Sequence, residues 1–233
     1  MSKRYAWEIN WLRNHGWSQQ QVEQLLDSDD DTPVEYLTGW AEFAGVSVQV
    51  DKNVLIPRVE TEKIAYRAIN SLRNGFLAYK MTKKSKNQKK GEYEPYSVVE
   101  VGTGSGGLAL AIAMAVPSVR ILALDISQPA VMVAKSNVRA YHKQKQIQVR
   151  QSNLLQAVKE DELAQKWLLL ANLPYIPTAD YQHLQPCVKD YEPRLALDGG
   201  EDGAQLIRQL LVQVGCMSLP PTIIGLEDRK SVV

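Results

Sequence analysis

The sequence has few cysteines and no long apolar run, and each scarcity excludes a class of protein. Its two cysteines, Cys187 and Cys216, have no CxxC spacing and are too few for a disulfide framework. We expect a reducing compartment and two small buried thiols. The longest apolar stretch, LALAIAMAV at 108–116, is too short to span a bilayer, and MSKRYAWEINW lacks the features of a signal peptide. These absences predict a cytoplasmic protein without a membrane partner.

An excess of charge of either sign is also missing. The chain has 27 basic and 26 acidic residues, a net charge of +1, so no global attraction to nucleic acid or membrane is expected. The local exception is a run with six lysines between residues 80 and 90. We interpret it as a solvated loop, with a contact to RNA or an acidic partner as the alternative.

The length of 233 residues suits one main core with a small appendage. Two short helices are predicted in the first 30 residues, with Ser18 capping the second. A hairpin of short strands is predicted over YLTGWAEFAGVSVQV (36–50), followed by a helix after Pro57. The expected division is a helical part at 1–31, a hairpin linker at 32–57, a helix and lysine-rich loop at 58–96, and a core at 97–233.

From residue 97 onward, strand-like and helix-like segments alternate. Short β-branched runs occur at 97–101, 119–125, 146–150, 167–172 and 221–227, and helical patterns lie at 108–116, 130–143 and 204–215. Such alternation is typical of βαβ units, in which helices cover both faces of a parallel sheet. The predicted fold is a doubly wound, mostly parallel α/β domain.

A glycine-rich turn, VVEVGTGSGG at 98–107, separates a predicted strand from an apolar helix. Glycines let a ligand approach main-chain N–H groups at a helix N-terminus. The spacing fits the dinucleotide pattern GxGxxG (Gly102, Gly104, Gly107) and also the S-adenosylmethionine pattern ExGxGxG, which begins at Glu100 and ends at Gly106. A turn without a ligand is the structural alternative.

Two acidic residues bear on the ligand, and one of them distinguishes the two cofactors. Asp125 ends the next strand, 23 residues after Gly102, where an acid can accept hydrogen bonds from both ribose hydroxyls of either cofactor. Its structural alternative is a cap on the helix near Pro129. Glu100 favours the cationic amino-acid end of S-adenosylmethionine, because a pyrophosphate gains nothing from a second negative charge. The balance favours S-adenosylmethionine.

A rigid corner, ANLPYIP at 171–177, follows the fourth core strand. Asn172 should lie at the carboxyl edge of the sheet, where open α/β sheets bind ligands. Its side-chain oxygen and a main-chain carbonyl can accept both hydrogens of a planar NH₂ group, and Tyr175 can stack on the flat acceptor. Pro174 and Pro177 fix the backbone. A turn that only ends the strand is the structural alternative.

With these motifs the chain resembles the HemK/PrmC family of class I methyltransferases, which methylate the glutamine side-chain amide in the GGQ motif of peptide chain release factors. The matching segments are PVEYLTGWAEFAG (33–45), VLIPRVETE (54–62), EVGTGSG (100–106), ALDIS (123–127), NLPYIP (172–177) and YEPRLALDGGEDG (191–203). The resemblance implies a release factor as partner, S-adenosylmethionine as cofactor and no metal site.

The resemblance also assigns residues to roles. The cofactor set is Glu100, Gly102, Thr103, Gly104, Ser105, Gly106, Asp125, Asn153 and Asn172. The catalytic set is Asn172, Pro174 and Tyr175, and the substrate set adds Leu173, Arg58 and Glu60. Arg58 and the segment 60–62 are implied to line the same mouth. Asp198, Gly199 and Gly200 are implied to shape the neighbouring loop.

The chain departs from the family pattern at several positions. Leu173 replaces the first proline of NPPY, and the resulting NLPY also occurs in rRNA adenine dimethyltransferases. Val59 replaces a common proline, and Ser152-Asn153 replaces an acid that follows the third core strand. The helical part is about half the family's usual size. The chain ends near the fifth core strand, whereas the family's sheet continues with an antiparallel pair. Either this is a short form or the C-terminal hairpin is missing, and the sheet edge is then expected to be exposed or covered by a partner.

Three other functions stay open. One is adenine-N6 methylation of RNA or DNA, which NLPY and the lysine run favour. Another is S-adenosylmethionine binding with weak catalysis, suggested by the short ends and Asn153. A nicotinamide dehydrogenase is the last, although no acid-base pair for hydride transfer is evident, and His183 is interpreted as a solvated loop residue.

Overall fold

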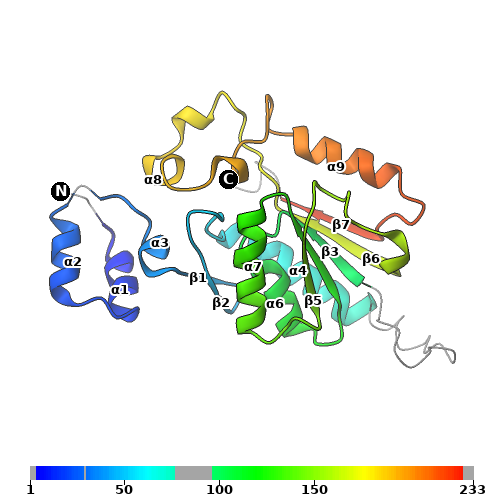
Figure 1. Cartoon of the computed structure of the whole chain (residues 1–233), viewed down its shortest axis with the longest axis horizontal. Coiled ribbons are helices and arrows are strands. Elements are labelled where there is room, and N and C mark those ends of the chain that lie inside the picture. Colours follow the sequence, from blue (N-terminus) through cyan, green and yellow to red (C-terminus); the bar gives the residue numbers. More distant parts are fainter. Residues whose placement is uncertain (1–3, 29, 77–95, 228–233) are drawn as a thin grey trace.

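The computed structural model describes residues 4–28, 30–76 and 96–227. Its centre is a five-stranded sheet in the order β5-β4-β3-β6-β7, and all four pairings are parallel (Figure 1). The strands are β3 (Tyr96–Val101), β4 (Ile121–Asp125), β5 (Ile147–Gln151), β6 (Leu163–Ala171) and β7 (Ile223–Leu226). The predicted parallel α/β fold is confirmed.

Helices cover both faces of this sheet (Figure 1). One face packs against α4 (Glu62–Ser71), α6 (Gly107–Ala115) and α7 (Gln128–Ala140), and the other against α9 (Gln205–Gly215). Strand side chains alternate between the faces: Val98 belongs to the first apolar cluster and Val99 to the second. The inner strands β3, β4 and β6 are buried on both faces near the site, which explains their near-continuous apolar runs, whereas the edge strands β5 and β7 are partly exposed.

The strand order creates a crevice at the carboxyl edge of the sheet. The first core strand, β3, lies between β4 and β6, and at such a reversal of strand order the flanking connections leave toward opposite faces. Gly102 follows β3 and Asn172 follows β6, so the two meet there. A Cβ on Gly102 would lie 3.2 Å from the main-chain oxygen of Asn172.

A two-stranded hairpin closes one side of this crevice. Its strands, β1 (Trp40–Phe43) and β2 (Val46–Gln49), pair antiparallel. Asn137 of α7 is 1% exposed and exchanges two hydrogen bonds with the main chain of Gln49, while its Nδ2 also donates to the main-chain oxygen of Ser105. One buried amide therefore joins the hairpin, α7 and the glycine turn.

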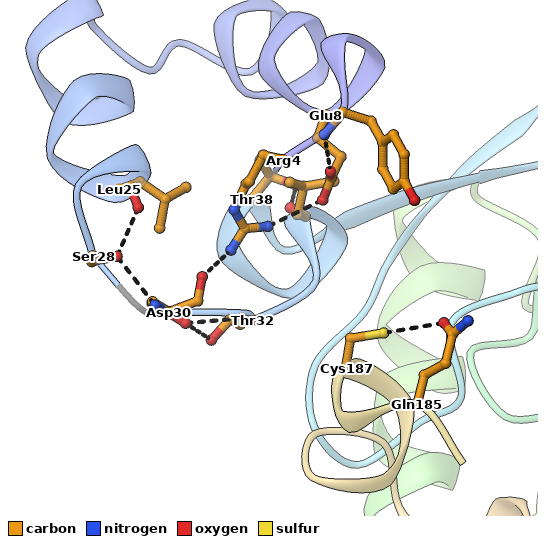
Figure 2. Close-up of polar contacts among 11 residues, drawn as sticks. Arg4, Glu8, Leu25, Ser28, Asp30, Thr32, Thr38, Gln185 and Cys187 are labelled. Carbon is orange, nitrogen blue, oxygen red and sulfur yellow. Dashed lines mark hydrogen bonds and ion pairs between the residues drawn. The ribbon is translucent and has the colours of Figure 1, made fainter. Parts of the chain in front are cut away.

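The N-terminal helices form a separate apolar cluster beside the hairpin (Figure 1). They are α1 (Ala6–Asn14), α2 (Gln19–Leu26) and α3 (Val34–Thr38). Ser18 caps α2 as predicted. Figure 2 shows how Arg4 joins two segments: its guanidinium donates to Glu8 and to the main-chain oxygen of Asp30.

Short elements connect these units. They are η1 (Val59–Thr61), a π-helical turn η2 (Leu72–Phe76), η3 (Glu160–Glu162), η4 (Tyr181–His183), α8 (Pro186–Lys189) and η5 (Arg194–Ala196). His183 is exposed in η4. No helix in the described part of the chain is long and apolar enough to cross a membrane.

Two expectations were wrong, and a third concerns residues that the structure does not describe. Residues 36–38 were expected in the hairpin but belong to α3, because Pro33 precedes the helix and Gly39, with φ of +76°, ends it. Cys187 is half-buried and Cys216 exposed, since they lie in one-turn α8 and directly after α9. The lysine run at 80–90 lies outside the described residues.

Candidate active site

A cavity opens at the carboxyl edge of the sheet, where the motifs predicted from the sequence converge. Its walls come from the hairpin, residues 53–57, the glycine turn, and the segments that follow β4, β5 and β6. The predicted site residues that line it are Glu100, Gly102, Thr103, Gly104, Ser105, Asp125, Asn153, Asn172, Leu173 and Pro174. Those that do not are Gly106, Tyr175, Arg58 and Glu60.

The glycine turn uses backbone conformations that other residues rarely adopt. Gly102, Gly104 and Gly106 have φ of +76°, +53° and +83°. Nothing lies within 4 Å of the place where a Cβ of Gly104 would stand, so this main chain is open to a ligand. Gly106 instead packs against Ala134 of α7. The turn therefore leaves a bare main-chain wall on the cavity.

Glu100 is a buried carboxyl in the cavity wall. It is 3% exposed, and the Thr103 hydroxyl donates a hydrogen bond of 2.9 Å to it. Burial raises the pKa of Glu100 to about 8, with a smaller contribution from the negative charge of Asp125. At neutral pH this carboxyl is therefore mostly protonated.

Asp125 lies at the end of β4 and accepts two main-chain hydrogen bonds. Gly104 N–H donates to one oxygen at 2.8 Å and Ser127 N–H to the other at 2.9 Å. Burial raises its pKa, and these bonds oppose the rise. The cap of α7 is Ser127, whose hydroxyl accepts from Ala130 N–H. The helix-cap alternative for Asp125 is therefore wrong.

The segment after β5 forms a tight turn beneath the cavity. The Ser152 hydroxyl donates to the main-chain oxygen of Leu154 at 2.7 Å and accepts from Ala157 N–H at 3.0 Å. Leu154 has φ of +51°, an uncommon value for leucine. Asn153 is exposed between them and lines the cavity, so its carboxamide is available to a ligand.

The corner after β6 presents Asn172 to the cavity. Its Nδ2 donates to the hydroxyl oxygen of Thr61 at 2.9 Å. Because this bond engages the NH₂ group, Oδ1 is the atom left to accept a hydrogen bond from a ligand. Leu173 is 5% exposed and packs into the apolar cluster under α9, so it replaces the family's proline with buried apolar volume.

A glycine-containing loop supports the corner from behind. A Cβ on Gly199 would lie 2.5 Å from the Pro174 oxygen, and one on Gly203 would lie 2.3 Å from the Tyr175 oxygen. Asp198 accepts hydrogen bonds from Thr178 and Arg194 and so fixes the loop. This close packing explains the segment LDGGEDG (197–203).

The remaining predicted substrate residues lie outside the cavity wall. Arg58 forms an ion pair with the buried Glu192, which also accepts Ile56 N–H. The ring of Tyr175 is half-buried, and burial raises the pKa of its hydroxyl. Neither side chain reaches the cavity in this structure, so acceptor stacking by Tyr175 stays a prediction.

Sequence reasoning missed parts of this site. Thr61 belongs to the segment 60–62 that was expected at the mouth, and it lines the cavity, but its bond to Asn172 was not predicted. Leu195 and Leu206 close the cavity from the side of α9. No local pattern identifies these residues, because their role arises from contacts between segments distant in the chain.

Comparisons with known proteins find relatives that resemble this chain in sequence, and solved structures that resemble it in fold. The family model "Ribosomal protein L11 methyltransferase (PrmA)" matches residues 79–173. A release factor glutamine methyltransferase of Enterococcus faecalis is 30% identical, and the alignment covers 91% of this chain and 80% of that protein. The chain belongs to the release factor glutamine methyltransferase family.

The alignment with this chain does not cover the full length of every relative. The release factor glutamine methyltransferase of Rhodopirellula baltica is 35% identical over 77% of this chain but only 55% of its own length. The chain thus spans little more than half of that relative. A crystal structure of the hMettl16 catalytic domain in complex with the MAT2A 3′UTR hairpin 1 aligns with a TM-score of 0.50 at 12% identity, over 79% of this chain and 63% of that one. This likeness supports the class I methyltransferase fold alone.

Proposed function

We propose that this protein transfers a methyl group from S-adenosylmethionine to the side-chain amide nitrogen of the glutamine in the GGQ motif of a release factor. Membership of the family supports the proposal. The observation that carries it is the bond from Asn172 Nδ2 to Thr61, which leaves Oδ1 as an acceptor at the cavity.

The cavity fits the proposed cofactor. The bare main chain at Gly104 can approach the ligand closely, and Asp125 has lone pairs left for the two ribose hydroxyls. Asn153 would face the adenine, and Glu100 would face the cationic amino-acid end. When bound, S-adenosylmethionine supplies a sulfonium methyl that is ready for transfer.

The corner fits a planar NH₂ group as acceptor. An amide nitrogen is a poor nucleophile because its lone pair is delocalised into the carbonyl. Asn172 Oδ1 and a main-chain carbonyl of the corner would accept its two hydrogens and aim the nitrogen at the methyl group. The residues thus contribute orientation and electrostatic stabilisation, and no general base is needed before attack.

The partner and the location follow from the same proposal. A GGQ-containing release factor domain is the proposed partner, and the cytoplasmic location expected from the composition stays a prediction. We propose that Tyr175, Arg58 and Glu60 contact the release factor outside the cavity rather than within it. The domain boundaries predicted at residues 31, 57 and 96 are likewise retained as a proposal.

Radiolabelled S-adenosylmethionine and a purified release factor test this function. We expect label in the wild-type factor and none in a variant whose GGQ motif is changed to GGA. Equal labelling of the two factors would contradict the proposal. Label that appears instead in RNA or DNA added to a parallel reaction would favour adenine methylation.

A further inference from the structure

A buried carboxyl stands behind the acceptor corner. Glu227 directly follows β7, and its N–H donates to the main-chain oxygen of Ala171, the last residue of β6. Glu227 is 3% exposed and is not part of the cavity wall. No described residue makes a full hydrogen bond with either of its carboxyl oxygens. A carboxyl held in this way is costly, so its presence needs an explanation.

The Thr61 hydroxyl is a described group close enough to this carboxyl to affect its pKa. Burial raises the pKa of Glu227, while hydrogen bonding from the Thr61 hydroxyl opposes the rise. At the geometry of this structure the approach falls short of a full hydrogen bond. Thr61 is itself buried, and on its other side it accepts from Asn172 Nδ2. Thr61 therefore stands between Glu227 and Asn172.

The order of these groups decides which way the Asn172 carboxamide faces. A threonine hydroxyl has one hydrogen to donate and lone pairs that accept, so Thr61 alone could bind either end of the carboxamide. The Glu227 carboxyl, whether ionised or protonated, has an oxygen that can accept this hydrogen. With Glu227 on the far side, the hydroxyl hydrogen of Thr61 would turn toward the carboxyl, while a lone pair accepts from Asn172. That lone pair selects Nδ2 and leaves Oδ1 for the acceptor.

We propose that Glu227 is a positioning residue, which acts through Thr61 to hold Asn172 with its carboxamide oxygen toward the acceptor NH₂ group. The proposal rests on the proposed function, because the acceptor is the amide of that reaction. With the carboxamide reversed, two NH₂ groups would face each other and the acceptor would not bind productively. Glu227 thereby enforces selection for a hydrogen-bond donor without touching the substrate.

Turnover of variants tests the chain of contacts. Thr61→Val and Glu227→Leu are each expected to lower kcat about 100-fold, the usual cost of a misplaced reacting group. Thr61→Ser keeps the hydroxyl and is expected to stay within a few-fold of wild type. Glu227→Gln keeps an acceptor oxygen and is expected to recover most of the loss seen in Glu227→Leu. The Kd of S-adenosylhomocysteine should change little throughout.

The double variant Thr61→Val/Glu227→Leu separates a shared pathway from two independent defects. If both residues act through Asn172, the double variant is expected to be no slower than either single variant. Losses that multiply would overturn the proposal, as would wild-type kcat in Glu227→Leu. Glu35→Gln is the matched control, because Glu35 is another carboxyl whose pKa burial raises and it does not line the cavity.

Thermal unfolding tests whether Glu227 has only a structural role. Replacing a buried carboxyl that lacks a full partner with leucine is expected to leave the melting temperature unchanged or higher. A purely structural residue would instead lose stability together with activity. Unfolding of Glu227→Leu at a lower temperature than wild type would contradict the proposal.

Nuclear magnetic resonance of the Asn172 side-chain NH₂ group keeps the inference testable if the wild type transfers no methyl group. A wild type that transfers no methyl group would contradict the proposed function, but it would not test the contacts among Glu227, Thr61 and Asn172. One sharp, slowly exchanging NH₂ pair is expected in the wild type and in Thr61→Ser. Broadened or fast-exchanging signals are expected in Glu227→Leu and Thr61→Val, and unchanged signals in Glu227→Leu would overturn the inference.

Discussion

Among single residues, Glu100 has a protonation state that burial changes. Its pKa of about 8 in the folded protein exceeds the ordinary value of 4.5, so the folded chain keeps a proton that the unfolded chain releases between these pH values. The free energy of unfolding should therefore fall as pH rises through this window, by up to about 1.4 kcal/mol per pH unit from this group. Glu100→Gln should lack this contribution.

Urea denaturation of both proteins at several pH values between about 5 and 8 measures this difference. Because the other titrating groups are common to both proteins, subtracting the two curves isolates Glu100. Glutamine can still accept from Thr103, so the local hydrogen bond survives. Parallel curves for wild type and variant would show that the carboxyl ionises normally in the folded protein.

Replacing Asn172 or Asp125 with alanine is expected to affect different quantities, turnover in the first case and cofactor affinity in the second. Asn172→Ala removes the acceptor for the substrate amide, and we expect turnover to fall by about 100-fold or more with little change in cofactor affinity. Asp125→Ala removes charged hydrogen bonds, and we expect the Kd of the cofactor to rise by about tenfold or more. Calorimetry and single-turnover kinetics measure both quantities. Similar losses of cofactor affinity in both variants would contradict the assignment.

At the scale of elements, the loop that backs the corner determines its shape. Gly199→Ala and Gly203→Ala would each place a methyl group within 2.5 Å of a main-chain oxygen of the corner, and Gly203 has φ of +76°. We expect each change to cost on the order of 1–3 kcal/mol of stability and to lower turnover by moving Asn172.

Gly215→Ala is the control for these two variants. Gly215 is the last residue of α9 and has open space where its Cβ would stand. Its replacement should be neutral or slightly stabilising, because alanine favours helices more than glycine does. Melting temperatures and kcat of the three variants test the comparison. Normal turnover in Gly199→Ala and Gly203→Ala would show that the corner does not depend on this loop.

The elements of the core could be predicted from the sequence because their physical signals are local. Apolar β-branched runs between glycine and proline punctuation gave all five strands of the sheet. The glycine turn and the corner were identified as cavity segments for the same reason, since each directly follows a strand. Residues 36–38 were assigned wrongly, because a five-residue helix is too short to have a clear period.

Contacts between distant segments could not be predicted in this way. The bond between Thr61 and Asn172 joins residues separated by 111 positions, and the ion pair of Arg58 with Glu192 spans 134. Arg58 was expected at the substrate mouth because of the resemblance to the family. Its partner Glu192 comes from a different loop, and nothing local in the sequence indicates the pairing.

At the scale of the whole molecule, the site depends on the order of the sheet. The strands β3, β4 and β6 bring Glu100, Asp125 and Asn172 to one edge, although they are far apart in the chain. The hairpin then closes the cavity through its bonds to Asn137. The proposed donor pocket and the proposed acceptor corner thus share one wall, as the proposed methyl transfer requires.

Fragmentation mass spectrometry of a release factor, after incubation with this protein and S-adenosylmethionine, tests the central claim most directly. The account predicts one added methyl group on the side-chain amide nitrogen of the GGQ glutamine, and none when Asn172→Ala replaces the wild type. A methyl group on another residue of the factor, or unchanged modification by Asn172→Ala, would contradict it.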